Sequence, residues 1–539
     1  MPTVNKALLP ANLYSLYLPG IIITCYLVLG LWSMQYDDIT YDESPHLRYG
    51  INLLKGNPGR SMDTARFRST MPVTALNALP RAAVQILSPG LKKNDWGNSD
   101  IRDGRYITLL VSVWLLLYTY YFATGLTDPR AGVVVLALVA FDPNLLAHAR
   151  LVTTDMYAAL GFIATIYHLW KWLEKRGRPH FFYCCLAIAL AQVCKPVNIL
   201  LYPVCGFLTL TWLWRHREAW TAQKLAIGFL VFMAIQILII NASFEFSGPW
   251  GYTLSGQHWQ SHFFKVLQSG WLGSIPVPFS RAYTDAFDLV QYERETFSGT
   301  AYNYLLGELR YKQGFWNYYL VCYGLKTPLF TLLITLSAIL YGVVAGRDRA
   351  LFLRYGLFPC TALLLLLSSS SVQNGYRYLL PVTILLIIFS AFPVARLLAR
   401  SSKLLTYAFL AIPFVTVLFS FPGYLVYSNA LLQPKKMAYQ YLADSNFNWG
   451  QRRTVLKDFL KRYPDYIFEP EMPFRGHLLI DLNHLAGITD PGRFRWLREN
   501  YRPLFTVEGC YLAFDTTQPP GNAADQYTYF KQSQFFSCP

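Results

Sequence analysis

Two carboxylates and an imidazole lie just where the chain leaves a long apolar run. The run LPGIIITCYLVLGLWSM is followed by the stretch YDESPHLRYG, which contains Asp42, Glu43 and His46. On a helix, Asp42 and His46 would be one turn apart and share a face. A carboxylate that is partly desolvated beside lipid can have a raised pKa and act as a general base near neutral pH. The structural alternative is that Asp42 or Ser44 caps a helix starting near Pro45.

A second acidic position opens a later apolar segment. In the stretch HARLVTTDMY, His148 is followed by Asp155, which stands at the start of an apolar run. An acid at the end of a membrane-spanning helix is costly if it faces lipid, so we expect it to face a cavity or a partner group. Helix capping by Thr153, Thr154 or Asp155 is the structural alternative, and both interpretations can hold together.

Basic residues also stand in or beside apolar segments, and they are Arg150, Lys195, Lys326 and Arg377. Lys326 lies within such a segment, in YGLKTPLF, where a buried lysine needs a partner. A lipid phosphate at the level of the headgroups would serve as that partner. Snorkelling of each side chain to ordinary headgroups is the alternative.

The stretch LADSNFNWGQ is dense in hydrogen-bonding groups around one tryptophan. Asp444, Asn446, Asn448 and Gln451 surround Trp449 in the sequence. Such sets suit sugars, because sugar hydroxyls bond to polar side chains while the C–H faces stack on aromatic rings. The alternative is a turn that leads into a helix over RRTVLKDFLKRY.

The composition places these residues in a membrane protein. The chain has 539 residues, of which 53% are hydrophobic and only 14% charged, and its mean hydropathy is +0.26. Soluble domains carry about 25% charged residues. The net charge of +16 agrees with the Lys and Arg that membrane proteins retain on their inner side, so we do not expect nucleic acid as a partner. The sequence contains no P-loop, GxGxxG, HExxH or GxSxG motif, which argues against a nucleotide donor bound in a Rossmann domain.

Apolar segments of spanning length recur along the chain. The sequence predicts an α-helical polytopic membrane protein with about 11 transmembrane helices. The predicted spans are 14–34, 106–124, 131–147, 155–172, 181–194, 197–214, 225–243, 316–345, 355–371, 378–395 and 404–424. Proline at Lys195-Pro196 is expected to break the helix or turn the chain back between the fifth and sixth spans.

The basic loops predict an orientation in the cytoplasmic (inner) membrane. The alternate short loops KWLEKRGRPH, RHREAWTAQK, GRDRALFLR and ARLLARSSK are rich in Lys and Arg and are expected in the cytoplasm. The N-terminus is then cytoplasmic, whereas loops 35–105 and 244–315 and the C-terminus are exported. The first apolar run lacks a clear cleavage site and is expected to be retained. The stretch QHWQSHFFKVLQSGWLG predicts an amphipathic helix at the membrane interface.

The sequence predicts two domains. Residues 1–435 form the transmembrane domain, and residues 436–539 form a small exported domain in which helix-like and strand-like segments alternate. The expected fold of this tail is α/β. Cys510 and Cys538 in the tail could form a disulfide in an oxidising compartment, and a pair of free thiols is the alternative.

Five stretches, taken in their order, resemble a known family. YDESPHLRYG, HARLVTTDMY, YLLGELRYKQGFWNYYLVCYGLKTPL, QNGYRYLLPV and LADSNFNWGQ are similar to motifs of bacterial members of the dolichyl-phosphate-mannose protein mannosyltransferase superfamily. The lipid A aminoarabinose transferases are more distant relatives. The resemblance implies the C-type glycosyltransferase fold. It also implies an enzyme that transfers a sugar from a polyprenyl-phosphate carrier to an acceptor on the exported face of the membrane.

The resemblance also assigns roles to residues. It implies that Asp42 is the base that activates the acceptor hydroxyl, with Glu43 as the second choice, and that Asp155 supports the site or the acceptor. Basic positions that match the family pattern are candidates for binding the carrier phosphate, and they are Arg150, Lys326 and Arg377. Lys195, His46 and His148 are further substrate-binding candidates, as are Asp444, Asn448, Trp449 and Gln451.

Displacement at the anomeric carbon needs a base on one side and a stabilised phosphate on the other. A single displacement inverts the configuration. We expect no obligatory metal, although paired acids could hold Mg²⁺ or Ca²⁺. The tail differs from the β-trefoil of the eukaryotic protein mannosyltransferases, so a glycan, a lipid or a protein all remain as acceptors. A transporter or flippase of a lipid-linked sugar, and a glycan-binding scaffold, are the rival functions; a transporter would place charged groups near mid-membrane.

Overall fold

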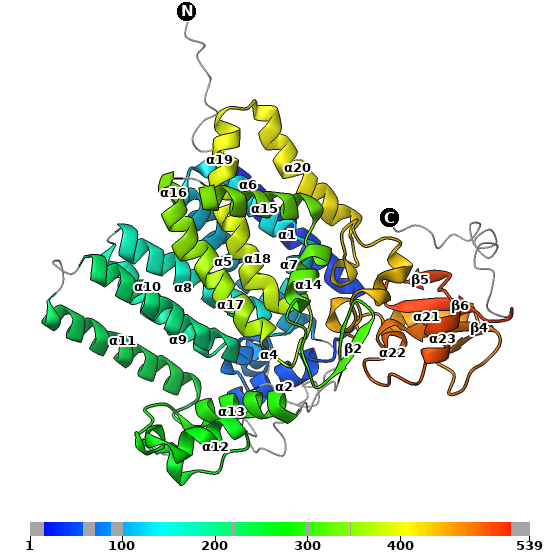
Figure 1. Ribbon diagram of the computed structural model, residues 1–539, viewed down its shortest axis with the longest axis horizontal. Helices are drawn as coiled ribbons and strands as arrows, with labels where there is room; N and C mark the ends of the chain where they lie inside the picture. Colours follow the sequence, from blue (N-terminus) through cyan, green and yellow to red (C-terminus); the bar gives the residue numbers. More distant parts are fainter. Residues whose placement is uncertain are drawn as a thin grey trace, which may run out of the picture.

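The computed structural model describes residues 16–57, 70–87, 101–175, 177–216, 221–248, 251–296, 302–344 and 346–518. Most of these residues are helical, and the apolar helices form the main body of the molecule (Figure 1). In chain order the helices of the body are α1 (Leu18–Ser33), α5 (Arg102–Leu126), α6 (Pro129–Ala140), α7 (Pro143–Ala149), α8 (Asp155–Lys175), α9 (Arg178–Gln192), α10 (Leu201–Arg215), α11 (Ala222–Ser243), α14 (Tyr318–Lys326), α15 (Leu329–Val344), α16 (Gly346–Leu351), α17 (Phe358–Ser368), α18 (Leu380–Phe389), α19 (Ala391–Ala399) and α20 (Lys403–Phe419).

Six helical stretches among the described residues are long and apolar enough to cross a membrane by length and composition. These stretches are Leu18–Tyr36, Arg102–Leu126, Pro196–Arg215, Ala222–Ser243, Asp348–Ser368 and Tyr376–Ala399. The bent pair α6 and α7 makes a seventh if it is counted as one span. The predicted multi-pass helical architecture is therefore present, whereas the count of eleven spans stays a prediction.

Two predicted spans are interrupted. The segment predicted as 131–147 forms α6 and α7, which meet at 66°, because Asp142 caps α7 by accepting from the backbone N–H groups of Asn144 and Leu145. The segment predicted as 316–345 is divided between α14 and α15, where Pro328 has no N–H to continue the first helix. The break predicted at Pro196 is confirmed, since α9 ends at Gln192 and the 3₁₀ turn η5 (Pro196–Leu200) follows.

The loops between the spans also contain helices. Four of them lie at one end of the helical body, and they are α2 (Glu43–Leu54), α4 (Ala75–Leu87), α12 (His262–Ser269) and α13 (Arg281–Thr296) (Figure 1). The opposite end carries α16, α19 and α20. The predicted amphipathic helix corresponds to α12, whose exposed side chains include Phe263 and Val266. A short antiparallel hairpin, β1 (Tyr302–Leu305) and β2 (Glu308–Tyr311), precedes α14.

The tail folds as a sheet with helices beside the helical body (Figure 1). Its elements are α21 (Arg453–Arg462), β3 (Tyr466–Phe468), β4 (His477–Asp481), α22 (Leu482–Ala486), α23 (Arg495–Asn500), β5 (Phe505–Val507) and β6 (Tyr511–Asp515). The strand order is β3-β4-β6-β5, with β3 and β4 parallel and the other pairs antiparallel. Cys510 is buried in this unit, and Cys538 lies outside the described residues, so their pairing stays a prediction.

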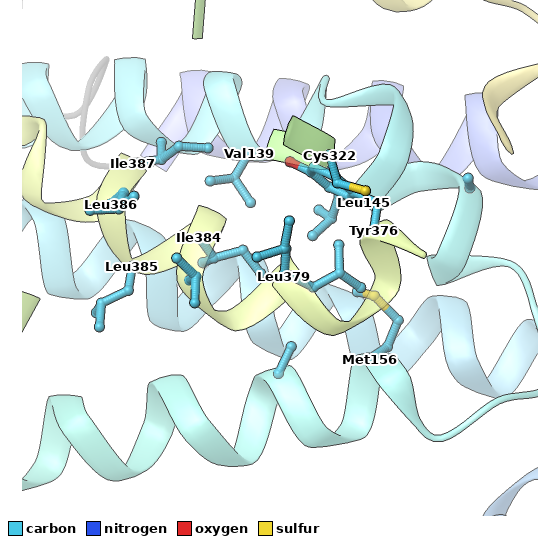
Figure 2. Packing of buried hydrophobic residues seen from close by; sticks show 14 of the residues in the cluster. Val139, Leu145, Met156, Cys322, Tyr376, Leu379, Ile384, Leu385, Leu386 and Ile387 are labelled. Atoms are coloured by element: carbon cyan, nitrogen blue, oxygen red, sulfur yellow. The ribbon is translucent and has the colours of Figure 1, made fainter. Parts of the chain in front are cut away.

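Buried apolar side chains from several of these helices form one continuous core. Figure 2 shows side chains of α6, α7, α8, α14 and α18 packed together, among them Val139, Met156, Cys322 and Ile384. Tyr376 also lies in this core, in the 3₁₀ turn η10 (Tyr376–Leu379) that opens α18. Arg377, the next residue of η10, therefore lies directly beside this core in the chain.

Candidate active site

Asp42 stands at the N-terminus of α2, but its side chain makes no capping hydrogen bond there. Its Oδ2 instead accepts a hydrogen bond from Nη1 of Arg377 at 2.7 Å. Arg377 is fixed from two further sides, because its Nε donates to the carbonyl oxygen of Asn374 at 3.1 Å and its guanidinium lies 4.2 Å from the ring centroid of Trp449. Three of the motifs found in the sequence therefore meet at one ion pair.

Asp155 forms a second ion pair close to the first. Its Oδ1 lies 2.5 Å from Nζ of Lys195. That Nζ is 3.7 Å from the ring centroid of Tyr378, and the guanidinium of Arg377 is 5.6 Å from the same centroid. The cations of both ion pairs therefore lie near one aromatic ring.

His46 lies within the same charged cluster. It interacts electrostatically with Asp42, Asp155, Arg377 and Lys195. Desolvation lowers its pKa below the usual value, against the two carboxylates that raise it, so the imidazole is neutral near pH 7. A neutral imidazole can donate one hydrogen bond and accept another, which suits contact with a sugar hydroxyl.

Exposure separates the two acids. The side chain of Asp42 is 39% exposed, whereas that of Asp155 is 2% exposed. Desolvation raises the pKa of Asp42, but the charge and hydrogen bond of Arg377 outweigh it and leave the pKa below the usual value. Asp42 is therefore ionised and accessible to solvent. Asp155 is also ionised, but it is buried in its ion pair with Lys195.

Asp444 brings a third carboxylate to this cluster. It lies in the 3₁₀ turn η13 (Asp444–Asn446), with a positive φ of 61°. Burial raises its pKa, Arg377 lowers it and Asp42 raises it again, with a net rise above the usual value. His148 completes the cluster on the side of α7, where its ring lies 6.1 Å from that of Trp449.

Glu43 is engaged elsewhere, although it is the neighbour of Asp42. Its carboxylate is fully buried and accepts hydrogen bonds from Nε and Nη2 of Arg105 at 2.8 and 2.7 Å. It also accepts from the backbone N–H of Thr40 at 2.8 Å and of Val152 at 2.9 Å. Four donors occupy this carboxylate, which ties the first acidic motif to α5 and to the chain before α8.

Arg150 belongs to another buried ion pair beside the site. Its Nη2 lies 2.7 Å from Oδ2 of Asp37, and its guanidinium lies 5.2 Å from the ring centroid of Tyr424. Arg452 approaches the other oxygen of Asp37 at 3.4 Å and donates from Nη1 to the carbonyl oxygen of Tyr36 at 2.6 Å. This cluster joins the loop before Asp42 to the start of the tail.

Backbone hydrogen bonds strengthen that junction. The N–H of Asp38 donates to the carbonyl oxygen of Gln451 at 3.0 Å, and that of Tyr41 donates to Trp449 at 3.1 Å. The carboxylate of Asp38 caps α21, because its Oδ2 accepts from the N–H of Thr454 at 2.6 Å and its Oδ1 from the Thr454 hydroxyl at 2.6 Å. Hydrogen bonds to the tail therefore stabilise the loop that precedes Asp42.

We expect Asp38→Ala to lower the free energy of unfolding by about 1 kcal/mol, because a helix cap lost to alanine typically costs about 0.5–2 kcal/mol. Thermal unfolding of the purified protein in nanodiscs measures this change. Asp38→Asn keeps an oxygen that can accept from the backbone and is expected to recover most of it. An Asp38→Ala variant as stable as wild type would contradict a capping role.

Lys326 is fully buried next to the site. Its Nζ donates to the carbonyl oxygens of Leu425 at 2.9 Å and Asn446 at 2.5 Å and lies 4.9 Å from the ring centroid of Phe447. The ammonium of Lys326, at the end of α14, therefore hydrogen-bonds the main chain of the segment before Trp449. In this arrangement it holds main-chain groups and does not form an ion pair among the described residues.

The amides of the last motif face into the protein. Asn448 donates to Asp481 at 2.7 Å and accepts from the N–H of Gly450 at 3.0 Å. Gln451 accepts from the N–H of Trp449 and donates to the carbonyl oxygen of Phe447, both at 2.7 Å. The structure thus places these two amides in a turn that precedes α21, as the alternative interpretation describes.

The acidic motif does not form a cation cradle. Glu43 turns to Arg105 and Asp42 to Arg377, so the two neighbours do not converge. Within the described ranges, no group of three or more His, Cys, Asp or Glu side chains could hold a metal ion. Asp42 and Glu43 therefore do not fit a shared site for Mg²⁺ or Ca²⁺, and metal dependence stays a prediction.

Sequence reasoning missed Arg105, Asp37, Arg452 and Tyr378. One signal was available, because Arg105 stands directly before the predicted span 106–124, and a basic residue at such a boundary needs an anionic partner if it is buried. The choice of Glu43 as that partner depends on a contact between residues 62 positions apart, which no local pattern predicts.

Fold and site together define a multi-pass helical membrane protein with paired carboxylates and cations at the ends of its helices. Residues 97–240 match the family described as dolichyl-phosphate-mannose-protein mannosyltransferase. This match confirms the resemblance to the mannosyltransferase superfamily that the sequence motifs indicate. The matched segment contains the second acidic motif and Lys195, and it lies between Asp42 and Arg377.

Solved structures provide more distant likenesses. The crystal structure of ArnT from Cupriavidus metallidurans bound to undecaprenyl phosphate is 15% identical over 78% of this chain and 67% of that chain, with a TM-score of 0.46. The apo oligosaccharyltransferase of Archaeoglobus fulgidus is 13% identical over 79% of this chain and 58% of that chain, with a TM-score of 0.46. AglB from Archaeoglobus fulgidus, in complex with an inhibitory peptide and a dolichol-phosphate, is 12% identical over 94% and 75%, with a TM-score of 0.44. No curated protein sequence matches the chain.

Proposed function

We propose that this protein is a glycosyltransferase that transfers a sugar from a polyprenyl-phosphate carrier to an acceptor hydroxyl, with Asp42 as the general base. The observation that carries the proposal is that the ion pairs Asp42–Arg377 and Asp155–Lys195 lie close together, with both cations near the ring of Tyr378. A base and two cations at one site are what displacement of a phosphate from a sugar requires. The family match over residues 97–240 supports the donor class.

The reaction is a single displacement at the anomeric carbon. The Asp42 carboxylate takes the proton of the acceptor hydroxyl while the hydroxyl oxygen forms the new bond to the anomeric carbon. The bond from that carbon to the phosphate oxygen breaks, and the phosphate leaves with the electron pair. Phosphate is stabilised by Arg377 and Lys195 and needs no protonation, and the configuration at the anomeric carbon inverts. The acceptor is a glycan, a lipid or a protein.

We place the site and the tail on the exported face of the cytoplasmic membrane, with the N-terminus in the cytoplasm. The basic short loops support this orientation. A cysteine introduced at Lys457, which is exposed on α21, is expected to react with an impermeant maleimide in intact spheroplasts. Labelling only after the membrane is opened would reverse the orientation.

Turnover tests the function directly. Purified protein in nanodiscs is given radiolabelled polyprenyl-phosphate sugars, hexoses and pentoses in turn, with an extract of the host's envelope glycans, lipids and proteins. Label is expected to leave the carrier for one donor class and to appear in one acceptor fraction. If no donor loses its label, although the protein is folded and all acceptor fractions are present, the result would favour a transporter. A flux assay of lipid-linked sugar in proteoliposomes would then decide.

Replacement of Lys195 tests the phosphate side of the proposal. We expect Lys195→Met to lower kcat/KM about 10- to 100-fold, since a hydrogen bond to a charged group contributes about 1.5–3 kcal/mol. Lys195→Arg is expected to recover part of the loss. The double variant Asp155→Asn/Lys195→Met removes the unpaired buried acid and separates lost stability from lost catalysis. Lys457→Met, at an exposed position, is the matched control, and an equal loss in that variant would refute the assignment.

A further inference from the structure

The proposed base is tied to a cation that could also bind the donor. Nη1 of Arg377 is bonded to Asp42 and Nε to the carbonyl oxygen of Asn374. Its Nη2 has no hydrogen-bond partner among the described residues, while the side chain retains 10% exposure. Arg377 therefore binds Asp42 through Nη1, and its Nη2 is available to bind a ligand.

We propose that Arg377 is a switch that keeps Asp42 inactive as a base until the phosphate of the donor takes the guanidinium away. This inference rests on the proposed function and goes further, because it makes the order of events part of the catalytic site. The donor binds first and frees the base. The acceptor hydroxyl is then deprotonated only in a complex that already holds the sugar to be transferred.

The geometry favours Arg377 over Lys195 as the group that exchanges. Lys195 and Asp155 lie 2.5 Å apart, and both side chains are more than four-fifths buried. Asp42 is 39% exposed, so water can replace the guanidinium when it leaves. A guanidinium binds phosphate with two parallel N–H groups, which is a stronger arrangement than its single bond to Asp42.

Arg377 needs only a small movement to change partners. The ring of Trp449, whose centroid is 4.2 Å from the guanidinium, and the bond from Nε to the carbonyl oxygen of Asn374 hold the base of the guanidinium. Rotation near these anchors would turn Nη1 and Nη2 together towards an incoming phosphate. Trp449 and the turn at Asn374 are thus positioning elements for the switch.

Four ionisable groups act on Asp42 from the elements around it. They are Arg377 from η10, His46 from α2, Asp155 from α8 and Asp444 from η13. Burial and Asp155 raise the pKa of Asp42, whereas Arg377 and His46 lower it. Since Arg377 is the largest lowering influence, its transfer to phosphate leaves the raising influences in excess. The carboxylate then becomes a stronger base as the reaction requires.

A titration of Asp42 without turnover is the first test. Difference infrared spectra, with Asp42→Asn subtracted, follow the carboxyl band of this residue against pH in nanodiscs. We expect polyprenyl phosphate to raise the midpoint by about 1–3 pH units, the range that a neighbouring arginine typically accounts for. In Arg377→Gln the midpoint should already be high without the lipid and should respond less to it.

The outcomes of this titration separate the inference from the function. An unchanged midpoint in wild type, at polyprenyl phosphate concentrations where direct binding is saturated, would overturn the switch and leave the glycosyltransferase intact. Polyprenyl phosphate that fails to bind would overturn the donor class, and with it both proposals. Arg495→Gln, at an exposed arginine of the tail, is the matched control and should titrate as wild type.

A pH profile supplies the second test. At saturating donor, kcat/KM for the acceptor reports groups of the donor complex. Its acid limb is expected to coincide with the Asp42 midpoint measured in the presence of polyprenyl phosphate, above that of the free enzyme. A limb at the midpoint of the free enzyme would show that Arg377 stays on Asp42 throughout the reaction, which contradicts the switch.

Discussion

Asp42→Asn is expected to lower sugar transfer by about 10²–10⁴-fold, the typical contribution of a positioned general base. Asparagine has nearly the same shape, but its amide cannot accept the proton of the acceptor hydroxyl. It also removes the negative charge that Arg377 pairs with. Because Asp42 is half-exposed and makes no capping bond, we expect the fold and the binding of the carrier to survive the change.

Single-turnover transfer, measured with the donor that the wild type uses, gives the size of this effect. Binding of polyprenyl phosphate is measured in parallel and should be retained. Asp458→Asn changes an exposed acid on α21 and should leave transfer unchanged. Equal transfer by Asp42→Asn and wild type would move the base to Asp155 or Glu43 and would remove the premise of the Arg377 switch.

The fold was predictable where the signal is local. Apolar runs placed the helices, and Pro196 predicted the break before η5. Strand-like GHLLIDL and GCYLAFD correspond to β4 and β6. The bend between α6 and α7 was missed, although Asp142-Pro143 is a sequence that favours turn initiation. An apolar run of spanning length hides such a capping residue, because hydropathy averages over it.

The sequence singled out the charged residues of the candidate site but not their pairings. The motifs contained Asp42, Asp155, Lys195 and Arg377, because charged groups are rare at apolar boundaries and so are visible there. Which acid meets which cation depends on contacts between residues 40 and 335 positions apart. Polarity alone also cannot separate a ligand-binding amide from one that stabilises a turn; Asn448 hydrogen-bonds Asp481 within the protein, and its contact with a sugar stays a prediction.

The neighbouring acids Asp42 and Glu43 therefore have opposite expected phenotypes. Glu43→Gln is expected to destabilise the protein by about 3–5 kcal/mol, because it removes the carboxylate that forms a buried ion pair with Arg105. Arg105 is 2% exposed and Glu43 is fully buried, so neither water nor salt can replace the lost partner. The change should appear as a large fall in the unfolding midpoint and in folded yield.

A double-mutant cycle distinguishes this structural part from catalysis. Arg105→Met should also destabilise, and Glu43→Gln/Arg105→Met should recover part of the stability because both charges of the buried pair are then removed together. Glu499→Gln breaks an exposed ion pair with Arg495 on α23 and should change stability by less than about 1 kcal/mol. A stable, folded Glu43→Gln with transfer abolished would instead make Glu43 a catalytic group.

The Glu43 carboxylate also accepts hydrogen bonds from the N–H groups of Val152 and Thr40. Its replacement should therefore loosen the position of Asp42 relative to Asp155. Residual transfer in the folded fraction is then expected to fall through kcat more than through KM.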